Sequence, residues 1–213
     1  MTNATWWLIG LTLVLAIADW TAVGLGSRWE YVFKPATMVP LIAAALALEP
    51  VDDTARWWFV AALVASLAGD VLLMLPDDRL FVFGLGSFLV GHLAYVAGLA
   101  AAGVSGGALL VGAVVVAVVM GALAPRLVVA ARRVDAALAV PVSAYITVIS
   151  VMVAFAVGST VPVAIAGAVL FAASDYMIGL SRFVRPFRGS RLAIITTYHV
   201  AQILLVVSLT RPR

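Results

Sequence analysis

Eight long apolar runs divide the 213-residue chain, and only short polar segments separate them. Each run is about 20 residues long, the length that an α-helix needs to cross the ~30 Å hydrocarbon core of a bilayer. A transmembrane barrel would instead show ten-residue segments of alternating polarity, and that pattern is absent. The sequence therefore predicts an all-α polytopic membrane bundle of eight transmembrane helices. Their expected limits are 5–25, 31–49, 56–75, 80–101, 107–124, 134–157, 160–180 and 191–210.

Composition narrows the class of protein further. Hydrophobic residues make up 65% of the chain and charged residues 11%, which leaves too little polar surface for a soluble domain of this size. Cys is absent and the only histidines are His92 and His199, which excludes thiolate chemistry and disfavours a multi-His metal site. We therefore expect no cofactor and no metal. The small net charge of +3 gives no sign of a nucleic-acid partner.

The short connections indicate one transmembrane domain over residues 1–213. The N-terminus lacks the basic segment of a cleaved signal peptide, so we take the first apolar run as a span. Nine arginines lie in the loops after odd-numbered spans and three on the other side. Because positive loops stay in the cytoplasm, both termini should face away from it, in a bacterial inner membrane. An aromatic belt would then place Trp6, Trp7, Trp57 and Trp58 at the outer interface, and Trp20 and Trp29 near the inner one.

Four charged residues fall inside the predicted spans: Asp19, Lys34, Asp70 and Asp175. A charge in the middle of a lipid-facing helix costs roughly 3 kcal/mol or more, so such residues are candidates for a functional site. All four fall in the cytoplasmic half of their spans. Unrelated lipid-exposed charges would not favour one depth, so we expect a shared polar cavity that opens toward the cytoplasm.

Further polar side chains are expected to extend this cavity. Several share a helix face with one another or with a carboxylate, because they lie three or four residues apart. These candidates are Ser66, His92, Tyr95, Tyr145, Ser174, Tyr198 and Gln202. Small residues beside the polar stripe of the fourth span, Gly84 and Gly91, would permit close helix packing.

Structural roles remain open for all of these residues. Lys34 can extend its amine to the headgroups from a helix end, and Asp19 can be interfacial. Asp70 and Asp175 can cap a helix or pair with a loop Arg, and His92 can bond a backbone carbonyl. The hydroxyl, phenol and amide side chains can serve as hydrogen bonds between helices.

A weak internal repeat is also visible. Asp70 and Asp175 lie 105 residues apart, Pro35 and Pro141 lie 106 apart, and His92 and His199 lie 107 apart. An offset of four spans preserves orientation, so the pattern favours two parallel four-helix halves, an arrangement known among membrane proteins.

The order of short motifs along the chain resembles the YhhN family, whose best-known members are lysoplasmalogenases. The resemblance covers about residues 31–208. It is carried by Lys34-Pro35, Ser66 to Asp70, Phe88 to Tyr95, Tyr145 with Met152, Gly167 to Asp175, and Tyr198 to Gln202. One departure is His199, where a second aromatic residue is expected in many relatives.

The resemblance implies hydrolysis of the vinyl-ether bond of a lysoplasmalogen, a lysophospholipid substrate drawn from the membrane. The products would be a fatty aldehyde and a glycerophospho-amine. This chemistry needs one protonated acid and one anion, and two carboxylates in unequal environments supply both. Asp70 and Asp175 are therefore the candidate acid and base, in either order. Lys34 is a candidate phosphate ligand, and the other polar residues would position the headgroup or water.

Rival hypotheses belong to other classes. Intramembrane Asp and Lys also form proton relays in transporters, although a carrier should have comparable polar groups in the outer half. A lipid-binding protein without catalysis would tolerate Asp-to-Asn changes. An acyl hydrolase would pair Ser66 with His92 as nucleophile and base, without a nucleophile-elbow motif. A cation held by Asp19, Asp70 and Asp175 also stays open, because these are hard oxygen ligands.

Overall fold

The computed structural model describes residues 2–76 and 78–210, and within them the protein is helical without a strand. Eight of the described helices are long and apolar enough to cross a membrane, as the sequence predicts. They are α1 (Asn3–Gly24), α2 (Glu30–Ala47), α3 (Asp53–Met74), α4 (Asp78–Ala102), α5 (Gly106–Val134), α6 (Ala139–Gly158), α7 (Pro162–Gly179) and α8 (Ser190–Ser208). A short helix η1 (Ala136–Leu138) precedes α6, and η2 (Leu180–Val184) continues α7.

The fifth predicted span, 107–124, lies inside a longer helix. Helix α5 continues past Pro125 to Val134, although proline removes a backbone hydrogen bond from a helix interior. Leu127 and Ala131 are buried beyond the proline, and Leu127 packs against Gly179. Packing therefore outweighs the local cost of the proline. As a consequence, the sixth helix begins at Ala139 instead of 134.

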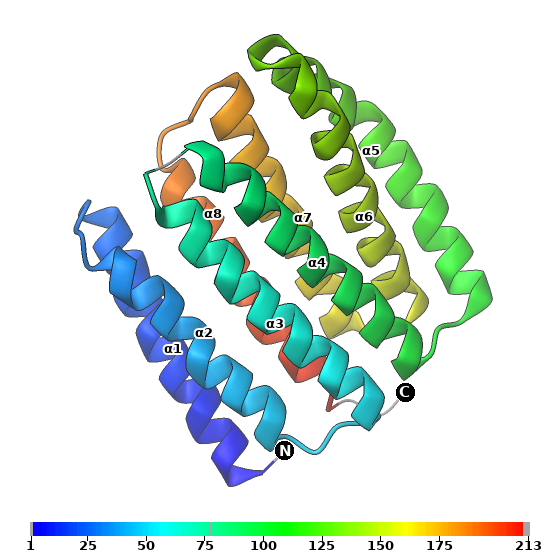
Figure 1. The fold of residues 1–213 in the computed structure, drawn as a ribbon. Coiled ribbons are helices and arrows are strands. Elements are labelled where there is room, and N and C mark those ends of the chain that lie inside the picture. The colour runs from blue at the N-terminus through cyan, green and yellow to red at the C-terminus, as the bar shows by residue number, and fades with distance from the viewer. Residues whose placement is uncertain (1, 77, 211–213) are drawn as a thin grey trace.

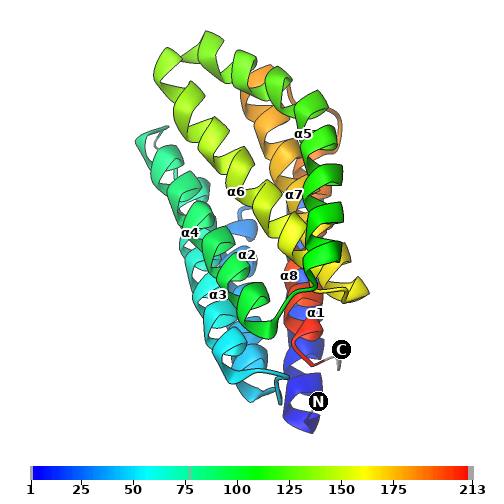
Figure 2. The same cartoon turned by 90° about the vertical axis from the view of Figure 1, so that its right-hand side faces the viewer.

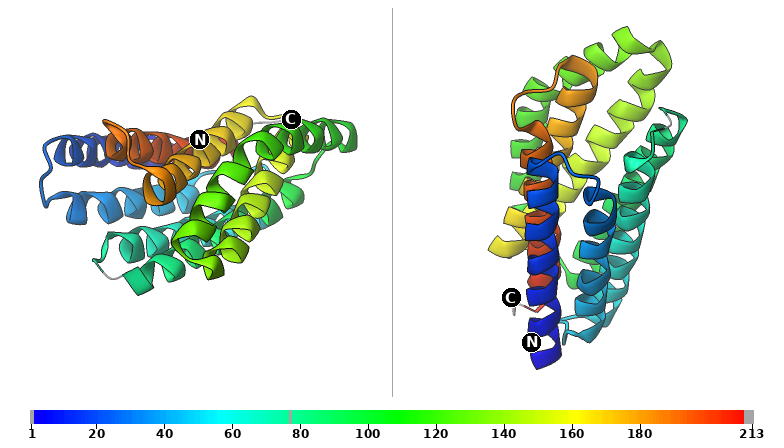
Figure 3. Two further views of the ribbon diagram at one scale, coloured as in Figure 1. Left: turned by 90° about the horizontal axis from the view of Figure 1, so that it is seen from above. Right: turned by 90° about the vertical axis from the view of Figure 1, so that its left-hand side faces the viewer.

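Seven of the described helices pack side by side in a closed ring. Following the contacts, the order around the ring is α1, α2, α3, α4, α6, α7 and α8, after which α8 returns to α1. Helix α5 lies outside the ring, against α6 and η2 (Figures 1 and 2). Seen along the helices, α1 and α8 lie across from α2 and α3 (Figure 3). The interior of this ring is where the polar candidates come together.

Helices α3 and α4 approach closely because glycines face the neighbouring helix. A Cβ added at Gly84 would meet Leu73 at 2.6 Å, and one at Gly91 would meet the Ala62 carbonyl and Ser66 Oγ at 3.2 Å. Both contacts confirm the expected role of these glycines in close packing. A Cβ at Gly69 would likewise meet the Phe88 ring at 2.6 Å. The two helices therefore hold the polar stripe of α4 directly against the face of α3 that carries Asp70.

Helix contacts are compatible with the predicted repeat of four helices. The contact of α4 with α6 has its counterpart, four helices on, in the contact of α8 with α2. The contact of α8 with α1 lacks an equally strong counterpart between α4 and α5. The first four helices and the last four thus have corresponding contacts inside the ring. They differ at α5, which lies outside the ring, whereas its counterpart α1 belongs to it.

The connections that carry most of the arginines lie at one end of the bundle, and the described chain ends lie at the other (Figure 1). Trp6, Trp7, Trp57 and Trp29 are exposed on the outside of the helices, as lipid-facing belts require. Trp20 differs, because its indole N–H donates to His199 Nδ1 at 3.1 Å across α1 and α8. Its position is therefore fixed by a helix contact as well as by the interface.

Candidate active site

Six helices of the ring each contribute a predicted polar residue to its interior. The side chains of Ser66, Asp70, His92, Tyr95 and Gln202 are at most 1% exposed. In water-free surroundings such groups are stable only when they are hydrogen-bonded or paired. Their contacts divide them into two carboxylate centres, one around Asp70 and one around Asp175.

The first centre joins α2, α3 and α8. Lys34 Nζ lies 3.0 Å from Asp70 Oδ1, and the Tyr198 hydroxyl donates to Asp70 Oδ2 at 2.6 Å. Lys34 is 20% exposed, while Asp70 is 1% exposed. Lys34 therefore does more than reach for the headgroups, because it compensates a buried charge. This ion pair favours the ionised form of Asp70.

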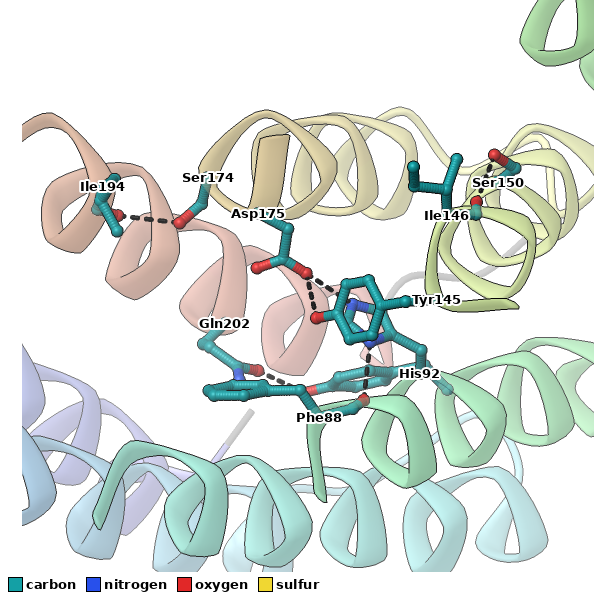
Figure 4. Close-up of polar contacts among 10 residues, drawn as sticks. Phe88, His92, Tyr145, Ile146, Ser150, Ser174, Asp175, Ile194 and Gln202 are labelled. Atoms are coloured by element: carbon teal, nitrogen blue, oxygen red, sulfur yellow. Dashed lines mark hydrogen bonds and ion pairs between the residues drawn. The ribbon is translucent and has the colours of Figure 1, made fainter. Parts of the chain in front are cut away.

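The second centre joins α4, α6 and α7. The Tyr145 hydroxyl donates to Asp175 Oδ2 at 2.5 Å, and His92 Nε2 lies 3.4 Å from the same oxygen (Figure 4). His92 Nδ1 lies 2.6 Å from the Phe88 carbonyl oxygen, which only accepts, so Nδ1 carries a hydrogen. In a neutral ring, Nε2 then presents a lone pair toward Asp175. One additional proton, on either the imidazole or the carboxyl, satisfies both groups.

Aromatic rings line the space between the two centres. Phe171 packs at 4.6 Å from the His92 ring and 5.4 Å from the Tyr198 ring, measured between centroids. Phe88 lies 5.8 Å from the Tyr198 ring. Ring faces stabilise a nearby cation. Sequence reasoning did not place Phe88 or Phe171 among the site residues, although both belong to the motifs that carry the resemblance.

Tyr95 and Gln202 extend the first centre toward the second. The Tyr95 hydroxyl donates to Gln202 Oε1 across α4 and α8, and Gln202 Nε2 is buried without a hydrogen bond. Ser66 Oγ is also buried without one. These two unsatisfied groups are suited to hold a water molecule, because buried polar atoms usually find a partner.

Two candidates differ from expectation. Ser174 Oγ donates to the Ile194 carbonyl at 3.0 Å and ties α7 to α8, pointing away from the Asp175 carboxylate (Figure 4). Its structural role, a hydrogen bond between two helices, is therefore the better description of Ser174. Asp19 is fully buried, so its side chain does not face the lipid, and both of its oxygens lack a hydrogen bond. Ser66 and His92 form no hydrogen bond with each other in the described structure, which removes the support for a Ser–His nucleophile.

An apolar pocket adjoins the second centre. Its wall includes Phe81 and Leu85 of α4, Met120 of α5, Ile149 of α6, and Tyr145 with Asp175 at one side. The pocket is partly open to the outside, and its lining is apolar apart from two tyrosines and Asp175. A single carboxyl group in an apolar pocket suits a hydrocarbon chain whose reactive bond lies at its polar end.

Comparison with known proteins places this geometry in a family. A model of the YhhN family matches residues 29–209, which is most of the chain. The chain belongs to the YhhN family. The resemblance inferred from the motifs is thereby confirmed, and all the residues of the two carboxylate centres lie within the matched region.

Relatives of this YhhN-family protein carry informative names. A Mycobacterium tuberculosis protein named lysoplasmalogenase is 36% identical over 177 residues, covering 80% of this chain and 66% of the relative. Human lysoplasmalogenase TMEM86B is 32% identical over 152 residues, covering 70% of this chain and 62% of the relative. The chain thus spans slightly under two thirds of these relatives' length. No solved structure matches this YhhN-family protein.

Proposed function

We propose that this protein is an intramembrane hydrolase that cleaves the vinyl-ether bond of lysoplasmalogens to a fatty aldehyde and a glycerophospho-amine. The relatives named lysoplasmalogenase support the reaction. The observation that carries the proposal is the unequal pairing of two buried carboxyl groups: Asp70 faces a cation, whereas Asp175 faces Tyr145 and an imidazole nitrogen. Vinyl-ether hydrolysis requires one proton donor and one anion, and these environments favour one of each.

In this mechanism, the proton shared by Asp175 and His92 goes to carbon 2 of the alkenyl chain, whose hydrocarbon tail lies in the apolar pocket. The C=C double bond is lost, and positive charge develops on carbon 1 and the ether oxygen. The Asp70 carboxylate and the rings of Phe88 and Phe171 stabilise that charge. This assignment makes Asp175 the acid and Asp70 the anion.

Water then attacks carbon 1 and gives up a proton to a carboxylate, which forms a hemiacetal. Collapse of the hemiacetal breaks the bond from carbon 1 to the glycerol oxygen, and that oxygen takes a proton. The unsatisfied Gln202 Nε2 and Ser66 Oγ are the groups that we assign to the water. No step of this scheme requires a metal or a redox cofactor.

We also infer that the site faces the cytoplasmic half of a bacterial inner membrane, with both termini on the other side. The bias of nine arginines against three supports this orientation. Lys34 and Asp70 lie near the arginine-rich end of α2 and α3. A single-chain lysophospholipid of the inner leaflet would then place its headgroup at that end and its tail along the helices.

The test is aldehyde release from lysoplasmenylethanolamine by purified protein in detergent. Asp70→Asn and Asp175→Asn should each lower kcat by about 10²- to 10⁴-fold, the usual contribution of a general acid or base. Ser150→Ala is the control variant, because Ser150 donates to the Ile146 carbonyl within α6 and lies away from Asp175 (Figure 4). Each variant is checked for folding by thermal unfolding.

Release that survives in both Asn variants would refute the carboxylate mechanism and leave the hydrolase assignment standing. A folded wild-type protein that releases no aldehyde would refute the hydrolase itself. The transporter and lipid-binding hypotheses would then take its place.

A further inference from the structure

A second, polar pocket lies next to the Lys34–Asp70 pair, and we call it the polar vestibule. Its wall includes Val23 of α1, Glu30, Tyr31 and Lys34 of α2, Leu73 of α3 and Arg191 of α8, and the pocket is open to the outside. Leu73, three residues after Asp70, lines both pockets, so the two pockets lie close to each other on either side of this residue.

Charges of both signs line the polar vestibule. Glu30 and Arg191 form an ion pair between α2 and α8, and Glu30 is 18% exposed while Arg191 is 63% exposed. Glu30 and Lys34 are four residues apart, so they share one face of α2. Lys34 approaches Asp70 at 3.0 Å, and its ammonium has three N–H groups, so donors remain for a ligand in the vestibule.

We propose that the polar vestibule binds the zwitterionic phosphoethanolamine headgroup, with Arg191 and Lys34 on the phosphate and Glu30 on the ammonium. This inference rests on the proposed function, because it assigns the two ends of the same substrate. On binding, Arg191 exchanges Glu30 for the phosphate, and Glu30 exchanges Arg191 for the ammonium. The internal ion pair of the free protein is thereby replaced by two ion pairs to the ligand.

The charge balance of the vestibule favours a zwitterion over an anion. Glu30 offsets Arg191, and Asp70 offsets Lys34, so the four groups sum to zero. A phosphate monoester without the amine would leave Glu30 beside additional negative charge. Arg191 lies in the first turn of α8, where the positive end of the helix dipole also favours a phosphate.

The experiment compares three substrates with the same alkenyl chain: the glycerophosphoethanolamine, the glycerol 3-phosphate and the uncharged glycerol. Loss of a charge-assisted hydrogen bond should raise KM by about 10- to 100-fold. Arg191→Gln should raise KM for both phosphorylated substrates, and Glu30→Gln for the ethanolamine substrate alone. In both variants kcat should stay unchanged, because these contacts are equal in the ground and transition states.

Two further variants serve as controls, one for loss of an arginine outside the vestibule and one for loss of the Glu30–Arg191 ion pair. Arg188→Gln removes an exposed arginine of the α7–α8 loop outside the vestibule lining, and it should leave all three KM values unchanged. The exchange Glu30→Arg with Arg191→Glu preserves an ion pair, so the protein should fold while ethanolamine selectivity is lost.

Unchanged KM values for the ethanolamine substrate in both Gln variants would overturn the headgroup assignment while the wild-type enzyme remained active. An equal rise in KM for the uncharged alkenylglycerol would also overturn it, because that result indicates a general disturbance of the site. A wild-type protein inactive on all three substrates would refute the proposed function, and the headgroup assignment with it.

Discussion

Lys34 connects the reaction centre with the polar vestibule. Its ammonium pairs with Asp70 on the inside, and its side chain reaches the vestibule on the outside. Because Asp70 is almost fully buried, its negative charge is stable there only with a partner. The residue therefore has one role in stability and, in the proposed function, a second role in ligand binding.

Lys34→Met should destabilise the folded protein by about 3–5 kcal/mol, because removing one partner of a buried pair leaves the other charge uncompensated. The measurement is thermal or denaturant unfolding in detergent. Adding Asp70→Asn should recover most of the loss, because the Asn amide carries no charge. Additive losses in the double variant would mean that the two residues do not interact.

Some candidate site residues can be identified from the sequence alone, and others only from contacts between helices. The sequence identifies Asp70, Asp175 and His92 because ionisable groups inside apolar spans are costly. It does not identify Arg191 or Glu30 as site residues, because they lie at span ends where charges are common. Their pairing across α2 and α8 joins residues 161 positions apart, and no local pattern encodes it.

Helix α1 lies before the region that the YhhN family model matches, residues 29–209, yet it completes the ring. Trp20 of this helix donates to His199, and His199 Nε2 is buried without a hydrogen bond. His199 is also the position where an aromatic residue was expected. The histidine is thus explained here as the acceptor of an α1 indole.

Trp20→Phe should lower stability by about 1–3 kcal/mol, because His199 would lose the hydrogen bond at Nδ1 while buried. Converting both positions, Trp20→Phe with His199→Phe, should recover much of that loss since no buried polar atom then remains. Unfolding midpoints of the two variants and the wild type provide the comparison. A double variant with a lower unfolding midpoint than Trp20→Phe alone would show that His199 has a further partner.

Helix α5 illustrates how an element can differ from its local pattern. Its 29 residues extend about 43 Å at 1.5 Å per residue, which is longer than the ~30 Å hydrocarbon core. Pro125 lies inside the helix without ending it, and Leu127 and Ala131 are buried beyond it. Packing between elements distant in sequence, in this case with η2, decided the limit of this helix.

At the scale of the whole molecule, the proposed orientation can be tested with single cysteines because the chain contains none. Ser105 lies in the α4–α5 connection, and Ala136 follows α5 at the arginine-rich end; both are exposed. In intact bacterial cells, an impermeant maleimide should label Ser105→Cys, and should label Ala136→Cys only after the membrane is opened. The reverse pattern would invert the topology and move the site to the outer half.

The sequence by itself determined the class of fold and the eight helices that can span a membrane. These follow from a local quantity, the length of each apolar run. The cost of charge in lipid also identified the ionisable residues inside the spans as candidates for a site. Order and spacing of the motifs also sufficed to identify the family.

Only the tertiary structure decided which carboxylate faces Lys34 and which faces His92, that Ser174 points away, and that α5 stands outside the ring. The same holds for the two pockets that Leu73 lines. Helical periodicity states which residues share a face of one helix, but the neighbour of that face depends on how all the helices pack.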